Sequence, residues 1–162
     1  MSTFDTFIEP LIEREGGEKI VVDTGGTTKY GISERGTDLS ADEIKALTKR
    51  KAIEIYRKHY YEPSKCNRLP EHLQEAFFDS VVNQGISRAT KILQTAANHK
   101  NSKGAKIAVD GRIGNQTIKA VQNLESERFR AFRVLHYAKI TLDRPDKYEI
   151  YYYGWFRRAL SL

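Results

Sequence analysis

The segment 13–33, EREGGEKIVVDTGGTTKYGIS, constrains the fold of this chain more than any other stretch. Two glycine pairs, Gly16-Gly17 and Gly25-Gly26, bracket a short apolar run. Glycine pairs end helices and also form tight turns between strands. The segment therefore predicts that a helix stops at the first pair and that a small antiparallel element follows it. Acidic side chains, Glu15 and Asp23, stand just before the two pairs.

The residues before the first glycine pair predict a helix. Apolar side chains recur at the spacing of one helical face, and Ser2 or Thr3 can cap its start. Extending that face by three residues reaches Glu15. Burial beside an apolar stripe and the negative end of a helix both favour the protonated form of a carboxyl group. Glu15 is therefore either a general acid or an ordinary surface carboxylate at a helix end. The apolar residues are Phe4, Phe7, Ile8, Leu11 and Ile12.

Strand-forming residues between 21 and 32 predict a hairpin or a three-stranded ribbon that turns at Gly25-Gly26. A hairpin folded back over the helix end would bring Asp23 and Thr28 opposite Glu15. Glycoside hydrolases use two carboxyl groups on either side of the scissile bond: one donates a proton to the leaving oxygen, and the other orients water or stabilises positive charge on the sugar. Asp23 can equally be a turn residue that accepts backbone N–H bonds.

The rest of the chain reads as helices, so we expect a mainly α (α+β) fold. Ser40 and Glu43 form a capping box ahead of one helix, and Pro63 is expected to end the next. We expect Trp155 in the core and the tail as one or two short helices. Further helices are predicted near 49–61, 70–85, 87–97 and 126–142, with a polar loop at 98–106 and a Gly-rich turn at 109–116.

The chain has 162 residues and a net charge of +6, which favours anionic partners such as nucleic acid, a membrane surface or an acidic cell wall. An ordinary basic surface explains the charge as well. No apolar run of about 18 residues occurs, so no integral membrane segment is expected. The first residues do not form a signal peptide, and Cys66 has no second cysteine to pair with. We therefore expect the protein to be made and kept in a cytoplasm.

The opening segment resembles the signature of glycoside hydrolase family 108, the phage-type N-acetylmuramidases. The matching residues are Glu15-Gly16-Gly17, followed by D-x-G-G-x-T-x-Y-G-I from Asp23 to Ile32. Three later segments continue the likeness. Residues 78–85 are similar to a second helix of the family, and residues 109–117 to a peptidoglycan-binding segment. Residues 154–158 are similar to its closing helix, so the resemblance covers most of the chain.

The resemblance implies a lysozyme-like bilobed fold with a small N-terminal β-hairpin or ribbon and a cleft between the lobes. It implies one unit over residues 1–162, with a catalytic region at 1–97 and a peptidoglycan-binding-like region at 98–162. The expected reaction is hydrolysis of the β-1,4 bond between N-acetylmuramic acid and N-acetylglucosamine in peptidoglycan. We expect a monomer that binds glycan strands and no nucleic acid. We also expect a phage endolysin that stays in the host cytoplasm until it is released to the cell wall.

The resemblance also assigns roles to individual residues. Glu15 would be the general acid, while Asp23 and Thr28 would hold the attacking water or stabilise the oxocarbenium-like state. Tyr30 would line the sugar cleft, or else pack within the hairpin. Asn83 would bind an N-acetyl group, or else be an ordinary residue at a helix end. No cofactor and no metal are implied.

Other chemistries fit the sequence less well. The histidines show no metal-ligand spacing, and Cys66 has no nearby histidine to activate it. His59 and His136 stand on apolar helical faces and are expected in the core or at a cleft edge. Asp110-Gly111 is either a glycan contact or a tight turn. A lytic transglycosylase, a secretion-associated bacterial muramidase and a basic nucleic-acid-binding protein remain as alternatives, and the sequence leaves inverting and retaining outcomes open.

Overall fold

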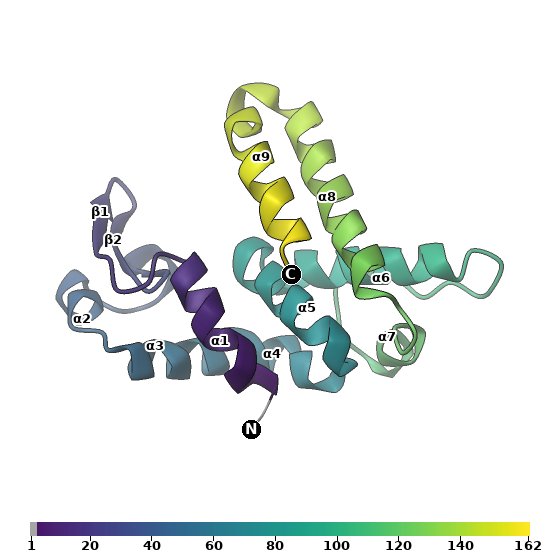
Figure 1. Cartoon of the computed structure of the whole chain (residues 1–162), viewed down its shortest axis with the longest axis horizontal. Coiled ribbons are helices and arrows are strands. Elements are labelled where there is room, and N and C mark those ends of the chain that lie inside the picture. Colours follow the sequence, from purple (N-terminus) through teal and green to yellow (C-terminus); the bar gives the residue numbers. More distant parts are fainter. Residues whose placement is uncertain (1–2) are drawn as a thin grey trace. The chain divides into compact units, whose positions relative to one another are not determined.

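The computed structural model describes residues 3–162, so the expected cap Ser2 lies outside the described residues. The fold is mainly helical with one small antiparallel sheet near the N-terminus, which confirms the predicted fold class (Figure 1). The chain forms two compact units that divide between Glu62 and Pro63. The first unit holds the sheet, and the second is built from helices and connecting loops.

Helix α1 (Thr3–Arg14) buries the apolar face that the sequence predicts, and it ends at the first glycine pair. The Gly17 N–H donates to the carbonyl of Ile12 at 3.0 Å, and the Gly16 N–H to that of Glu13 at 3.2 Å. Gly16 has a φ of 104°, a value that residues other than glycine rarely adopt. This left-handed end of the helix makes Glu15 its C-cap residue.

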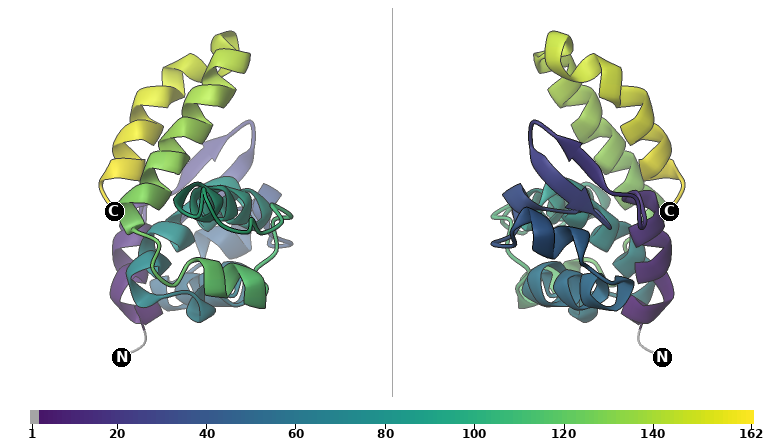
Figure 2. Two further views of the ribbon diagram at one scale, coloured as in Figure 1. Left: turned by 90° about the vertical axis from the view of Figure 1, so that its right-hand side faces the viewer. Right: turned by 90° about the vertical axis from the view of Figure 1, so that its left-hand side faces the viewer.

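The sheet consists of β1 (Val21–Asp23), β2 (Gly26–Lys29) and β3 (Ile32–Ser33), paired antiparallel in that order. Two-residue loops join the strands, with Asp23 opposite Gly26 at one end and Lys29 opposite Ile32 at the other. Within the first unit, the β1–β2 hairpin extends away from the neighbouring helices (Figure 2). This confirms the predicted three-stranded ribbon.

The helices of the first unit are tied to the sheet by a buried lysine. The Lys29 ammonium donates to the carbonyls of Lys45 and Leu47 at 2.9 and 2.8 Å, and so satisfies free carbonyls at the end of α2. The capping box of Ser40 and Glu43 is present at the start of the same helix, as predicted. The elements after the sheet are the 3-10 turn η1 (Glu34–Gly36), α2 (Ala41–Lys45), α3 (Lys49–Tyr56) and the π-helical η2 (Arg57–Tyr61).

The prediction that Pro63 ends a helix is wrong. Helix α3 runs through η2 into α4 (Glu62–Ser64), and Pro63 lies inside α4. Pro63 has no N–H to donate to the preceding turn; the segment before it is π-helical, and the helix ends one residue after it, at Ser64.

In the second unit, α8 and α9 form an antiparallel helical hairpin, and α8 packs against α5 and α6 (Figure 1). The tail is thus one long helix. Trp155 is only half-buried, and its ring stacks on Tyr137 with centroids 5.0 Å apart, so its expected place in the core is wrong. Helix α6 also extends into the segment that we predicted as a polar loop. The elements are η3 (Cys66–Arg68), α5 (Glu71–Gln84), α6 (Ile86–Lys100), α7 (Asn115–Ala120), α8 (Ser126–Asp143) and α9 (Pro145–Leu160).

Candidate active site

Glu15 is half-buried at the end of α1, where a turn of the sheet closes on its side chain. A Cβ atom placed on Gly31 would lie 2.6 Å from the Cβ of Glu15 and 2.5 Å from the Tyr56 hydroxyl. The pKa of Tyr60 is raised by burial and then by the charge of Glu15, which places this carboxylate near a second tyrosine. Glu15 therefore lies on a surface formed by one glycine and two tyrosines.

The β2–β3 turn that meets Glu15 is held in an uncommon conformation. Tyr30 and Gly31 both have positive φ values, 54° and 75°, which is the pattern of a type I′ hairpin turn. Two hydrogen bonds fix the Tyr30 backbone: its N–H donates to the carbonyl of Gly17 at 2.9 Å, and its carbonyl accepts from the Tyr56 hydroxyl at 2.9 Å. Strained backbone of this kind is often found at functional sites.

The Tyr30 side chain is buried, with 5% of its surface exposed. Burial and the neighbouring carboxylate of Glu18 raise the pKa of its hydroxyl. This is the packing within the hairpin that the sequence offered as one of two interpretations, and a contact between Tyr30 and sugar stays a prediction.

Asp23 and Thr28 share one face of the sheet. Thr28 lies opposite Val21, and Asp23 lies opposite Gly26; side chains two residues apart on a strand point to the same side. Thr28 stands near the end of the sheet that meets Glu15, whereas Asp23 stands at the far end of the hairpin. The Asp23 carboxylate accepts from the Gly25 N–H at 2.6 Å, so it also serves the turn.

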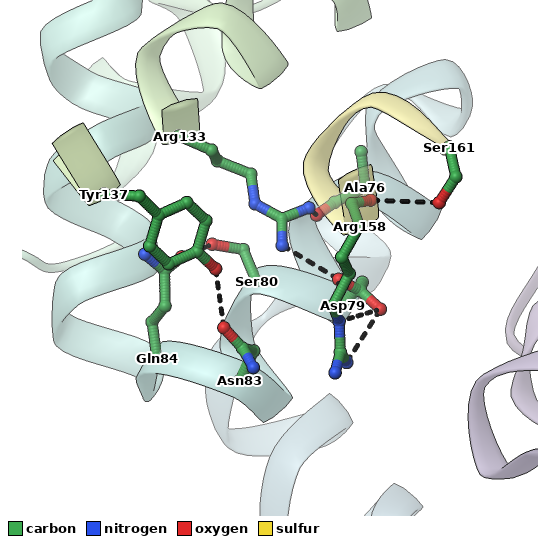
Figure 3. Close-up of polar contacts among 9 residues, drawn as sticks. All are labelled: Ala76, Asp79, Ser80, Asn83, Gln84, Arg133, Tyr137, Arg158 and Ser161. Atoms are coloured by element: carbon green, nitrogen blue, oxygen red, sulfur yellow. Dashed lines mark hydrogen bonds and ion pairs between the residues drawn. The ribbon is translucent and has the colours of Figure 1, made fainter. Parts of the chain in front are cut away.

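Asn83 lies in the second unit, near the end of α5. Its side-chain oxygen accepts a hydrogen bond from the hydroxyl of buried Tyr137 at 2.5 Å (Figure 3). The amide nitrogen of Asn83 makes no hydrogen bond to any residue within 3–162, and the residue is exposed. The side chain is therefore oriented by Tyr137 and presents two donors to solvent, as an amide that binds an acetyl carbonyl would.

A buried ion cluster adjoins this pair and was not predicted. Asp79 is fully buried and binds the guanidinium groups of Arg133 at 2.8 Å and Arg158 at 2.9 Å (Figure 3). Burial alone would raise the pKa of Asp79, but the hydrogen bonds and charges of the two arginines outweigh it and lower the pKa. An aspartate within the apolar run Phe77-Phe78-Asp79 was the available signal, and its partners lie 54 and 79 residues further along.

Two other sequence candidates have structural roles. Asp110 accepts from the side chain of Gln94 at 2.8 Å and from the Arg112 N–H at 2.9 Å. Gly111 is buried with a φ of 79°, and a Cβ there would lie 2.6 Å from the Ser87 hydroxyl. These contacts are those of a tight turn. Cys66 is buried, and burial raises the pKa of its thiol, which leaves it protonated.

A cavity of about 710 Å³ in the first unit is lined by residues of α2, α3, η2 and the adjoining loops, and includes His59. Glu15, Asp23 and Thr28 do not line it, so it is not the proposed reaction site. Across residues 3–162, no cluster of three or more histidine, cysteine or acidic side chains is arranged to hold a metal ion. The same residues form no helix long and apolar enough to cross a bilayer.

Comparison with known protein families assigns both parts of the chain. A sequence profile described as glycosyl hydrolase 108 matches residues 8–85, the range that contains Glu15, Asp23, Thr28 and Asn83. Residues 8–85 are a glycosyl hydrolase 108 domain. A second profile, described as a predicted peptidoglycan domain, matches residues 88–160. The chain is thus a glycoside hydrolase with a peptidoglycan-binding region, a peptidoglycan hydrolase, and the resemblance drawn from the sequence is confirmed.

A solved structure supports the fold of both parts. The structure of SagA from Brucella abortus is similar with a TM-score of 0.70 and 28% sequence identity, over 98% of this chain and 94% of that one. No curated protein sequence matches the chain.

The hydrolase domain and the peptidoglycan-binding region share one buried ion cluster. Asp79 belongs to the profile match of the hydrolase, whereas Arg133 and Arg158 belong to that of the peptidoglycan domain. Helix α5 therefore belongs to the hydrolase by sequence and to the second unit by its contacts. The division that we predicted after residue 97 stays a prediction.

Proposed function

We propose that the protein is an N-acetylmuramidase, which hydrolyses the β-1,4 bond between N-acetylmuramic acid and N-acetylglucosamine in peptidoglycan. One observation supports this most: the β2–β3 turn closes on Glu15, so that a Cβ atom on Gly31 would lie 2.6 Å from the Cβ of Glu15. A carboxyl group placed between apolar helix residues and a rigid turn is held in one position, as a general acid must be.

In the proposed reaction, Glu15 protonates the oxygen of the scissile bond as the bond to the anomeric carbon breaks. Asp23 and Thr28, which share a face of the sheet, position the water that attacks that carbon. Asp23 accepts the proton of this water, and Thr28 donates or accepts a second hydrogen bond. Asn83 donates its amide hydrogens to an acetyl carbonyl of the substrate.

The hairpin geometry favours inversion of configuration. Asp23 pairs with Gly26, three residues from Lys29, where the turn toward Glu15 begins. Three strand residues span about 10 Å. This backbone span is longer than the about 5–5.5 Å that separates the carboxyl groups of retaining enzymes, so we expect the wider separation of about 6.5–9.5 Å that admits a water molecule and gives inversion.

We further propose that the protein is a phage endolysin, which stays in the host cytoplasm until the membrane opens and then acts as a monomer. Its net charge of +6 would draw it to an anionic cell wall. Expression in bacterial cells, with and without a separate pore-forming protein, tests this role. Lysis that requires the pore supports it, and growth that continues in both cultures contradicts it.

The products of purified peptidoglycan test the reaction itself. After digestion and borohydride reduction, mass spectrometry should find N-acetylmuramitol ends on fragments that have gained one water per cut. Anhydro-muramic ends would mean a lytic transglycosylase, and reduced glucosamine ends would mean cleavage of the other glycosidic bond. Either result would overturn the proposed activity. Proton NMR of the first-formed anomer tests inversion.

A further inference from the structure

A small pocket of about 160 Å³ lies between α6 and α8 in the second unit. Ile92, Phe132 and Leu135 supply its apolar lining. Residues of the pocket recur at i, i+3, i+4 and i+7 on each helix, so two helical faces meet there. Four nitrogen-bearing side chains also line it: Arg88, Lys91, His136 and Lys139.

The pocket collects positive charge without a compensating carboxylate. No acidic residue lines it, and within residues 3–162 none of its four basic side chains has an ion-pair partner. The other end of the same helix pair is different. There Glu125 binds Lys100 at 3.0 Å and Arg128 at 2.9 Å, and these cations lower the pKa of Glu125 to about 2.

His136 lines the pocket together with Arg88 and Lys139. Burial lowers its pKa first, and the positive charges of Arg88 and Lys139 lower it further. Cations held together beside apolar side chains repel one another, and an anion bound among them would relieve that repulsion. The pocket is therefore arranged to accept a negatively charged group.

We propose that this pocket binds carboxylate groups on the peptide stems of peptidoglycan, an inference that rests on the proposed substrate. The sugars of the glycan strand carry no free carboxylate, because the acid group of the muramic acid is joined to the peptide stem. A site that binds anions therefore recognises the stems and not the sugars. A volume of 160 Å³ equals about five water molecules. It suits a carboxylate with a few carbons and is smaller than the roughly 300–1,000 Å³ of sites for whole ligands.

Nucleic acid is the alternative anion, and the geometry favours it less. Proteins that bind single strands combine a long basic groove with exposed aromatic rings on which bases stack. Here the basic groups surround one small hollow, and the ring of Phe132 is half-buried and packs on His99 with centroids 5.1 Å apart.

The test measures binding to insoluble peptidoglycan by sedimentation, with Glu15→Gln in every chain so that the polymer is not degraded. The pocket variant carries Arg88→Gln and Lys139→Gln. The control carries Lys103→Gln and Lys119→Gln, which make the same change of charge at exposed positions outside the pocket. Each chain is offered native peptidoglycan and the same material with its stem carboxylates converted to amides. Thermal unfolding confirms that all chains are folded.

We expect the parent chain to bind native peptidoglycan about tenfold more tightly than the amidated material, since two charge-assisted contacts are lost. The pocket variant should lose this preference, and the control should keep it. Equal binding of both materials by the parent, or an unchanged preference in the pocket variant, overturns the proposal. So does displacement of the parent from native peptidoglycan by a single-stranded oligonucleotide that the pocket variant does not bind.

This experiment is independent of catalysis. If the chain with Glu15 intact releases no sugar fragments but the carboxylate preference is present, the proposed reaction fails and the pocket stands. If fragments are released and the preference is missing, the pocket fails and the reaction stands.

Discussion

A Cβ atom on Gly31 would lie 2.6 Å from the Cβ of Glu15, so the turn between β2 and β3 touches the end of α1 at the proposed general acid. The contact is possible only because residue 31 has no side chain. The same turn is also bonded to the glycine pair that ends α1, because the Tyr30 N–H donates to the carbonyl of Gly17.

Gly31→Ala should therefore impair catalysis. The new methyl group must displace Glu15 or the Tyr56 hydroxyl, and alanine at a φ of 75° costs roughly 1–2 kcal/mol. We expect kcat to fall at least about tenfold, with a loss of stability of about 2 kcal/mol in chemical denaturation. Gly104→Ala is the control, since its nearest atom would be the Asn101 carbonyl at 3.8 Å. A Gly31→Ala enzyme with unchanged kcat would show that the turn does not position Glu15.

Asp79→Asn should destabilise the protein by about 3–5 kcal/mol, because it leaves the fully buried Arg133 without its counter-charge. Chemical denaturation measures this loss. Asp42→Asn, on a side chain that is 94% exposed and 3.3 Å from Lys45, should cost less than about 1 kcal/mol. Similar losses in both variants would contradict a structural role for the buried cluster.

The same cluster makes the stability of the folded protein depend on pH. The pKa of Asp79 is lower in the folded protein than its ordinary value of 3.8. The unfolded chain therefore takes up the proton first, and the stability that Asp79 contributes is present above about pH 4 and is lost as the pH falls further. Below pH 4, stability should fall more steeply in the native protein than in Asp79→Asn.

Tyr137→Phe should weaken substrate binding through Asn83. The substitution removes the hydroxyl that fixes the amide oxygen, so the amide can rotate. We expect KM for glycan fragments to rise several-fold, with kcat nearly unchanged and a stability loss of about 1 kcal/mol. In an Asn83→Ala background, Tyr137→Phe should add little to KM. Additive effects on KM would show that Tyr137 does not act through Asn83.

Arg88→Gln should raise the pKa of His136 toward its ordinary value of 6.5, because one of the two neighbouring positive charges is removed. Histidine C2-proton NMR measures this titration directly. Burial and the charge of Lys139 still lower the pKa in this variant, so it should not return fully. The Lys103→Gln variant should leave the titration unchanged. An unchanged His136 pKa in Arg88→Gln would mean that the two groups are not neighbours in solution.

The sequence predicted those parts of the fold that local chemistry decides. Helix α1 ends where Gly16 permits a left-handed residue, and α2 begins at the capping box of Ser40 and Glu43. Both depend on residues within a few positions of each other. The short loops that set the strand register are equally local.

Contacts between distant residues were not predictable in the same way. Nothing near Asp79 indicates that its partners are Arg133 and Arg158, because only the packing of α8 and α9 on α5 brings them together. Trp155 was misplaced for a related reason: a large aromatic residue in a tail was assumed to be core, whereas α9 packs as one side of a two-helix hairpin and leaves the ring half-exposed. The roles of Glu15, Asp23, Thr28, Tyr30 and Asn83 stay predictions.

The turnover of purified glycan strands by Glu15→Gln tests the central claim most directly. Glutamine keeps the size and polarity of the side chain but has no acidic proton to give. We predict that kcat falls about 100-fold or more, the usual worth of a general acid, while binding to peptidoglycan and thermal stability stay close to those of the native protein. A Glu15→Gln enzyme that keeps kcat within threefold of the native value would contradict the account.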